Sequence, residues 1–166
     1  LIEEPLAAAL GAGLDIRRPM GTMVVDIGGG TADIAVVTMG SISISKSVKI
    51  AGNILDEDII RYLRRERNIV IGEKTAESIK KRIGCAYLRD TELAIGIKGK
   101  HYITGMPITD EVNTTEVYLA MREHLEAIAE GVRSVLEVTP PELAGDISET
   151  GILLTGGGAL LDGMDK

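Results

Sequence analysis

Three consecutive glycines separate two apolar stretches early in the chain. Gly28, Gly29 and Gly30 follow an apolar run that ends in Asp26-Ile27, and Thr31 comes directly after them. Glycines at a hairpin tip leave backbone N–H groups unshielded, so phosphate oxygens could approach and accept several hydrogen bonds. Asp26 could hold Mg²⁺ through water, because this hard cation keeps several waters beside one or two carboxylates. An ordinary glycine-rich hairpin would have the same composition, so this motif alone decides nothing.

A second triple glycine lies near the end of the sequence. Gly156, Gly157 and Gly158 follow the apolar run 151–155 and precede Ala159. The missing side chains would let a flat adenosine lie against the backbone and the start of a following helix. A tight turn from strand to helix would look the same. The glycine patterns of Rossmann sites and of P-loop enzymes are both absent, so those two nucleotide-binding folds are disfavoured.

Two groups of charged residues could also take part in chemistry. Glu77, Lys80 and Lys81 are spaced to share one face of a helix, where an ion-paired solvated surface is the simpler interpretation. Glu3 and Glu4 precede a proline and a run of small residues, where negative charge would complement a helix N-terminus. A carboxylate at that place could instead orient a water against a phosphoryl group.

Hydrophobic patterning predicts the elements that would position these residues. We expect strands at 23–27 and 34–37, joined by the glycine turn, a third strand at 41–50, and a buried strand at 151–155. Helices are expected after Gly52, over 75–88 with Thr75 as N-cap, and over about 114–138, where Thr139-Pro140-Pro141 stops the helix. Short apolar runs at 93–95 and 102–103 indicate a small sheet.

Composition limits the kinds of partner. The 166 residues are 45% apolar but contain four Tyr and neither Phe nor Trp, so the core must be aliphatic. A net charge of -7 argues against nucleic acid, whose binding depends on Lys and Arg. The single cysteine, Cys85, cannot form an internal disulfide, and we expect it as a small apolar side chain on a helix. No run of about 18 apolar residues suggests a membrane span.

The beginning of the sequence has neither a basic region nor an initiator methionine. We therefore expect no signal peptide, and we expect the chain to be the interior of a longer one.

Three motifs occur together in the order found in the superfamily of actin, sugar kinases and heat-shock chaperone ATPases. They are Glu-Pro-x-Ala-Ala-Ala from Glu4, Asp-Ile-Gly-Gly-Gly-Thr-x-Asp from Asp26, and Leu-Leu-Thr-Gly-Gly-Gly-Ala ending at Ala159. Within that superfamily, the segments 47–53, 75–84 and 139–143 most resemble the MreB family of bacterial actin-like, cell-shape-determining proteins. The resemblance covers essentially the whole chain.

This resemblance implies an α/β fold. It would consist of a ribonuclease-H-like lobe, with a mixed sheet flanked by helices, and a smaller inserted α+β lobe. The first lobe would comprise residues 1–50 and 112–166, and the insertion residues 51–111. Family members also have an amino-terminal lobe with a first phosphate loop, which this sequence lacks, so the chain would hold about half of an ATP site.

The resemblance also assigns roles to individual residues. Glu4 would polarise the attacking water, and Asp26 would reach Mg²⁺ through water. The remaining residues would bind ATP: Gly28, Gly29, Gly30 and Thr31 around the β- and γ-phosphates, Glu77 and Lys80 near adenine and ribose, and Gly156, Gly157, Gly158 and Ala159 beneath the nucleoside. Ala32 replaces a small hydroxyl residue often found in this loop, which should not abolish phosphate binding.

The implied function is slow ATP hydrolysis coupled to assembly of a filament with itself, which would organise cell-wall growth and rod shape at the inner face of the cell membrane. Cell-wall synthesis proteins would be its partners, and membrane contact would come from sequence not present here. The chain alone should be inactive. A chaperone-type ATPase, a small-molecule kinase and a non-hydrolysing divisome or pilus adaptor of the same superfamily remain alternatives.

Overall fold

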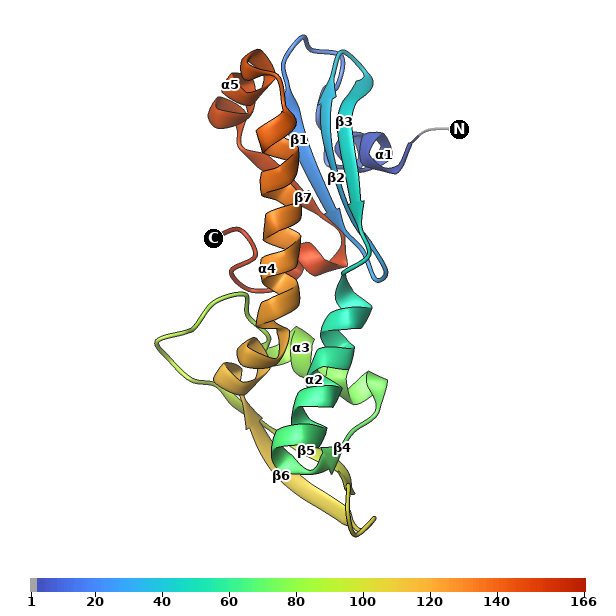
Figure 1. Ribbon diagram of the computed structural model, residues 1–166, viewed down its shortest axis with the longest axis vertical. Helices are drawn as coiled ribbons and strands as arrows, with labels where there is room; N and C mark the ends of the chain where they lie inside the picture. The colour runs from blue at the N-terminus through green and yellow to red at the C-terminus, as the bar shows by residue number, and fades with distance from the viewer. Residues whose placement is uncertain (1–2) are drawn as a thin grey trace. The chain divides into compact units, whose positions relative to one another are not determined.

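The computed structural model describes residues 3–166, which form two compact units (Figure 1). The first unit contains the described residues up to Gly52 together with Glu126–Ala159. The second contains Asn53–Leu125 together with Leu160–Lys166. Each unit is therefore built from segments that are far apart in the sequence.

A mixed four-stranded sheet forms the centre of the first unit. Its strands are β1 (Thr22–Ile27), β2 (Ala32–Thr38), β3 (Ser41–Val48) and β7 (Ile152–Thr155), in the order β3-β2-β1-β7. Strands β1, β2 and β3 pair antiparallel, whereas β7 runs parallel to β1. A two-residue turn joins β2 to β3, and both of its residues have positive φ angles, 51° at Met39 and 75° at Gly40. Such turns match the natural twist of paired strands.

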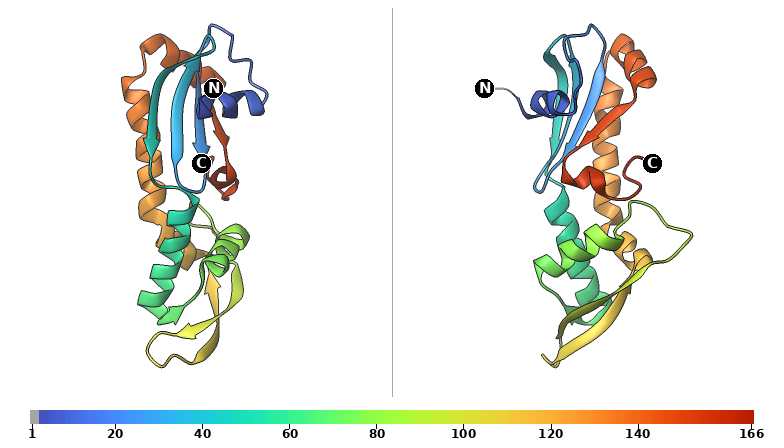
Figure 2. Two further views of the ribbon diagram at one scale, coloured as in Figure 1. Left: turned by 90° about the vertical axis from the view of Figure 1, so that its right-hand side faces the viewer. Right: turned by 180° about the vertical axis from the view of Figure 1, so that it is seen from behind.

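Helices cover both faces of this sheet, as the right-hand view of Figure 2 shows. Helix α1 (Glu4–Gly11) packs on one face, where its Ala9 lies against Val24 and Val37. The second half of α4 (Thr114–Val138) covers the other face. A Cβ at Gly131 would lie 2.9 Å from Val48, so glycine at this point lets the helix approach the sheet closely.

Helix α5 (Pro141–Thr150) leads into β7 and is tied to the start of β1. The backbone N–H of Gly21 donates to Asp146 Oδ2 at 2.6 Å, and a Cβ at Gly21 would lie 3.0 Å from Leu143. The chain therefore enters β1 next to α5.

The second unit packs three helices against a small sheet. Helices α2 (Gly52–Arg67), α3 (Glu73–Ile83) and the first half of α4 accompany an antiparallel sheet of β4 (Ile69–Val70), β5 (Ala94–His101) and β6 (Pro107–Asn113), in the order β4-β5-β6. Its core is aliphatic, as the composition requires: Leu55, Ile59, Leu63, Ile69, Ile71, Ala76, Ile79, Ile83, Ile97, Val112, Val117, Met121 and Leu125.

The predicted helix over 75–88 is wrong at both ends. Helix α3 starts at Glu73, with Gly72 rather than Thr75 as its N-cap, and ends at Ile83. Gly84 is extended, with φ -62° and ψ 143°, and its N–H bonds to Lys80 O. Cys85 is buried as expected, but it follows the helix and forms an isolated bridge with Asp162.

Other predicted elements are confirmed with shifted ends, but the strand predicted as buried over 151–155 is not buried: Ile152 of β7 is exposed and the rest of β7 is half-buried. Helix α4 has the predicted bounds, whereas β3 ends at Val48 instead of residue 50. Tyr102 and Ile103 lie in the turn between β5 and β6, not in a strand. The segment after Gly156 is a short 3₁₀ helix, η1 (Gly157–Leu160). No helix among residues 3–166 is long and apolar enough to cross a membrane.

The compact units differ from the predicted lobes at three places: residues 51–52 belong to the first unit, and residues 112–125 and 160–166 belong to the second. Leu1 and Ile2, which the first predicted lobe includes, fall outside the described residues. The assignment of the two units as a nucleotide-binding lobe and an inserted lobe stays a prediction.

Candidate functional site

The two glycine motifs meet at one edge of the first unit's sheet. Because β1 and β7 are parallel neighbours, with Asp26 opposite Thr155, the chain leaves both strands in the same direction. It leaves β1 through Gly28 and β7 through Gly156. The right-hand view of Figure 2 shows η1 beside the β1–β2 hairpin tip. The two motifs begin at Gly28 and Gly156, more than a hundred residues apart in the sequence, and they form one surface.

Glycine is required where the turn after β7 touches β1. Gly156 has a φ of +81°, and a Cβ there would lie 2.5 Å from Asp26 Oδ1 and still closer to Ile27 O. A Cβ at Gly158 would collide with the side chain of Ile27. Side chains at either position would push the turn away from β1. Close packing against β1 therefore requires glycine at positions 156 and 158, independently of any role in binding.

The hairpin tip between β1 and β2 is tight and open to solvent. Gly28 N–H donates to Thr31 O at 2.9 Å, which closes the turn, and Gly28 O accepts from Gly52 N–H at 3.1 Å. Gly29 and Gly30 are exposed, and no atom lies within 4 Å of a Cβ built on Gly30. This backbone is accessible to an anion, as a phosphate-binding turn must be.

Two carboxylates face each other across the start of this hairpin. Asp26 and Asp33 are directly paired on β1 and β2, so their side chains lie on the same face of the sheet. Like charges in such a pair repel, and a divalent cation would relieve that repulsion. Thr31 Oγ1 donates to Asp33 Oδ2 at 2.8 Å, which orients this carboxylate.

Asp33 is a candidate metal residue that we did not predict from the sequence. The spacing of Asp26 and Asp33 around a hairpin could have revealed the cross-strand pair. The described residues contain no cluster of three or more metal-ligating side chains. Two carboxylates nevertheless suit Mg²⁺, which is usually held by one or two carboxylates while waters and substrate phosphates complete its shell.

Glu4, the predicted catalytic residue, is the first residue of α1 in this same unit. It is exposed and makes no ion pair or side-chain hydrogen bond with any residue in 3–166. A carboxylate with no side-chain partner among these residues can accept a hydrogen bond from water. The catalytic role of Glu4 stays a prediction.

Glu77 and Lys80 lie on α3 in the second unit, and they have different partners. Glu77 pairs with Lys81 at 2.6 Å on the exposed face, and this hydrogen bond is the main reason that the pKa of Glu77 is lowered. Lys80 instead points to α2, where its Nζ lies 2.9 Å from Asp56 Oδ1. The solvated ion-paired face predicted from the sequence therefore holds for Glu77 and Lys81, but not for Lys80.

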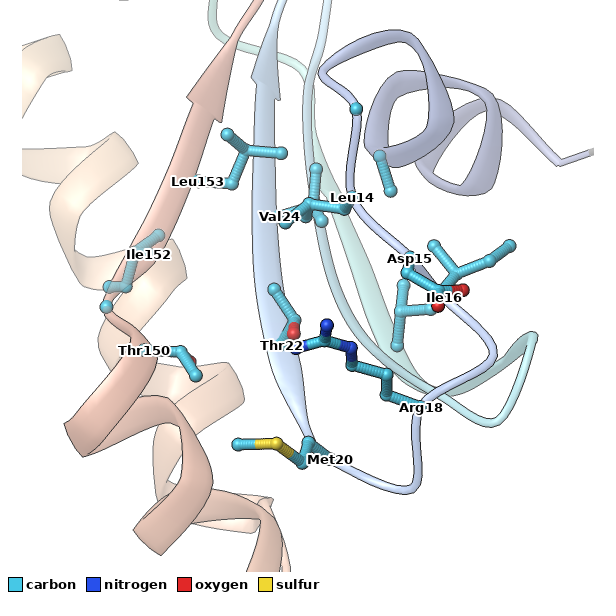
Figure 3. Close-up of a pocket in the computed structure, with 14 residues that line it drawn as sticks. Leu14, Asp15, Ile16, Arg18, Met20, Thr22, Val24, Thr150, Ile152 and Leu153 are labelled. Atoms are coloured by element: carbon cyan, nitrogen blue, oxygen red, sulfur yellow. The ribbon is translucent and has the colours of Figure 1, made fainter.

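A cavity of about 440 Å³ opens elsewhere in the first unit. It lies beside Thr22 at the start of β1, at the opposite end of the strand from the glycine hairpin (Figure 3). The side chains of Arg18 and Met20 lie beside Thr22, and Ile152 and Leu153 of β7 line another wall. None of the predicted site residues lines this cavity, so it is distinct from the candidate site.

Comparison with known proteins agrees with the motifs. A family model described as MreB/Mbl protein matches residues 1–166. The chain belongs to the MreB/Mbl family. It is 48% identical over 166 residues to the cell shape-determining protein Mbl of Bacillus subtilis (strain 168), covering 100% of this chain and 50% of that protein. It is 49% identical over 166 residues to the cell shape-determining protein MreB of Escherichia coli (strain K12), covering 100% of this chain and 48% of that protein.

Solved structures of the MreB/Mbl family share the fold. MreB5 of Spiroplasma citri bound to AMPPNP has 44% sequence identity and a TM-score of 0.92, over 96% of this chain and 48% of that one. The same protein bound to ADP gives a TM-score of 0.93, over 97% of this chain and 49% of that one. The predicted α/β class, a mixed sheet flanked by helices in the actin-like manner, is therefore confirmed. The chain spans about half the length of the curated relatives it matches.

Proposed function

We propose that the intact protein binds ATP with Mg²⁺, hydrolyses it slowly and polymerises into filaments that organise cell-wall growth and rod shape. The observation that carries the proposal is the meeting of the two glycine motifs and Asp26 at the ends of β1 and β7. Membership of the MreB/Mbl family supports it, as does the nucleotide bound to MreB5 of Spiroplasma citri. We place the filament in the cytoplasm, at the inner face of the cell membrane, beside cell-wall synthesis proteins.

In this proposal the hairpin tip binds the phosphates. Backbone N–H groups of Gly28, Gly29, Gly30 and Thr31 donate to the β- and γ-phosphate oxygens. The Thr31 hydroxyl already donates to Asp33, so Thr31 contributes its backbone N–H unless that hydroxyl turns. Asp26 holds Mg²⁺ through water and Asp33 assists it, since both are hard oxygen donors. When bound, this ion neutralises the charge of the phosphates.

The nucleoside lies against Gly156, Gly157, Gly158 and Ala159 in the same proposal, and Glu77 and Lys80 bind near adenine and ribose. Glu4 polarises the attacking water, a role open to an exposed carboxylate that has no side-chain partner among residues 3–166. Positioning and electrostatics supply most of the catalysis in phosphoryl transfer. Because this chain holds only about half of the site, we expect it to be inactive alone.

The test uses the intact protein and its Gly29→Asp variant. Gly29 is exposed at the hairpin tip, so a carboxylate should be tolerated by the fold but should repel the phosphates. We expect the parent to bind fluorescent ATP and to sediment as filaments with Mg-ATP, and the variant to do neither. The matched control is Gly145→Asp, which places the same charge on an exposed glycine of α5 with no atom within 4 Å of its Cβ.

The two measurements separate the parts of the proposal. One result would be that the parent binds ATP but forms no filaments in negative-stain microscopy with any nucleotide. That result would contradict the cytoskeletal role and leave the proposal of nucleotide binding in place. Equal ATP binding by the parent and Gly29→Asp would show that the hairpin is not the phosphate site.

A further inference from the structure

The second unit holds a largely buried ion pair between α3 and α2. Lys80 Nζ lies 2.9 Å from Asp56 Oδ1, and the two side chains are only 15% and 14% exposed. Helix α3 has another lysine, Lys81, whose side chain is 68% exposed in its pair with Glu77. Removing two charges from water is expensive, and replacing a buried ion pair with apolar side chains is often neutral or stabilising. A solvent-exposed Lys80, or an apolar pair, would therefore be the less costly arrangement.

The pair is also imperfect as a stabilising contact. Asp56 Oδ1 is the buried side-chain oxygen that lacks an aligned hydrogen bond among residues 3–166. Lys80 Nζ is close enough to this oxygen for charge attraction. Burial raises the pKa of Asp56, and the attraction of Lys80 opposes this shift. The carboxylate is therefore held in an environment that disfavours its charge.

What the pair does achieve is to fix the direction of a lysine ammonium. Lysine has a flexible four-carbon stem and three N–H donors. A buried carboxylate on the neighbouring helix restricts the rotamers of this stem, while an ammonium with three donors can serve Asp56 and a ligand together. Asp56 can therefore orient the ammonium before any ligand arrives, which lowers the entropy lost on binding.

We propose that Asp56 is a positioning residue for the nucleoside, acting through Lys80. The proposal rests on the function proposed above, in which Lys80 binds near adenine and ribose, and it adds that the ammonium reaches a ribose hydroxyl only while Asp56 holds it. In this proposal Asp56 contacts Lys80 rather than the nucleotide, and its Oδ1 is buried.

The test compares ATP with its 2′-deoxy and 3′-deoxy analogues, because a contact with a ribose hydroxyl is lost with that hydroxyl. Dissociation constants are measured on the intact protein with Mg²⁺ present. We expect the parent to prefer ATP over one analogue by about tenfold or more, since a hydrogen bond to a charged group contributes at least about a factor of ten in affinity. Lys80→Met should abolish this preference, and Asp56→Asn should reduce it to about threefold or less while ATP still binds.

The matched control is Asp58→Asn on the same helix. Asp58 is also buried, at 8% exposure, and it forms an ion pair with Arg61 and a hydrogen bond with the His124 ring, at 2.6 Å each. This substitution disturbs α2 to a comparable degree without touching Lys80. General damage to the unit would affect both variants alike, whereas loss of the ATP preference in Asp56→Asn alone supports positioning. Thermal melting of each variant checks that it is folded.

A double variant keeps the test decisive. If Asp56 acts through Lys80, adding Asp56→Asn to Lys80→Met should leave the ratio of the ATP and analogue affinities unchanged. The inference is overturned if Asp56→Asn keeps the parent's ATP preference, or if Lys80→Met does. With either of these results, the proposed function still stands if the parent binds ATP. If the parent does not bind ATP, both the proposed function and the role of Asp56 are refuted.

Discussion

Substitution of Gly156 by alanine tests whether the approach of the second glycine motif to β1 is as tight as the structure indicates. Gly156 has a φ of +81°, which costs an alanine about 1–2 kcal/mol. The new Cβ would also lie 2.5 Å from Asp26 Oδ1 and closer to Ile27 O, and such overpacking costs about 1–3 kcal/mol. The two terms predict a loss of about 2–5 kcal/mol in the free energy of unfolding.

Gly40→Ala is the control that separates the backbone cost of a positive φ from the cost of overpacking. Gly40 has a similar φ of +75°, but no atom lies within 4 Å of a Cβ built there. It should therefore lose only the backbone term of about 1–2 kcal/mol. Urea denaturation followed by circular dichroism measures both losses, and hydrogen exchange shows whether Gly156→Ala weakens protection in β1 and β7. Equal losses in the two variants would refute the close packing of Gly156 against β1.

Two further predictions concern the second unit. The pKa of Asp110 is below its usual 3.8, first because Glu111 N–H donates to it and then because Arg67 does. Its stabilisation should therefore be complete above pH about 4 and should disappear as the pH falls through the lowered pKa. The difference in unfolding free energy between the parent and Asp110→Asn should shrink on acidification; a difference that stays constant with pH would contradict this. Burial raises the pKa of the Cys85 thiol, so iodoacetamide at neutral pH should label Cys85 slowly in the native protein and much faster in urea. Equal labelling rates would show that Cys85 is accessible.

Local sequence signals were sufficient for helix α4 and for the hairpin of β1 and β2. The 25 residues of α4 are predicted with correct bounds because apolar side chains recur at helical spacing and Pro140 and Pro141 prevent its continuation. The hairpin of β1 and β2 is predicted because two buried apolar runs flank glycines. Both signals lie within the element itself.

The end of α3 could not be predicted in this way. Apolar residues continue at helical spacing beyond Ile83, but Gly84 is extended and the following chain packs against the C-terminal segment. A Cβ at Gly84 would lie 2.9 Å from Leu161, a residue far away in the sequence. A long-range contact therefore decides where this helix ends.

The sequence by itself determined the chemistry that this protein can offer: two glycine motifs, a carboxylate near the end of an apolar strand, and an aliphatic α/β core. These depend on residue type and short-range spacing, which any chain with this sequence carries. Only the tertiary structure decided which of these residues contact one another. Parallel pairing of β1 with β7 brings Gly156 against Asp26, antiparallel pairing sets Asp33 opposite Asp26, and the packing of α2 with α3 gives Lys80 to Asp56 rather than to its own helix. Contacts of this kind join residues that are distant in sequence, so they depend on how whole elements pack and not on any local pattern.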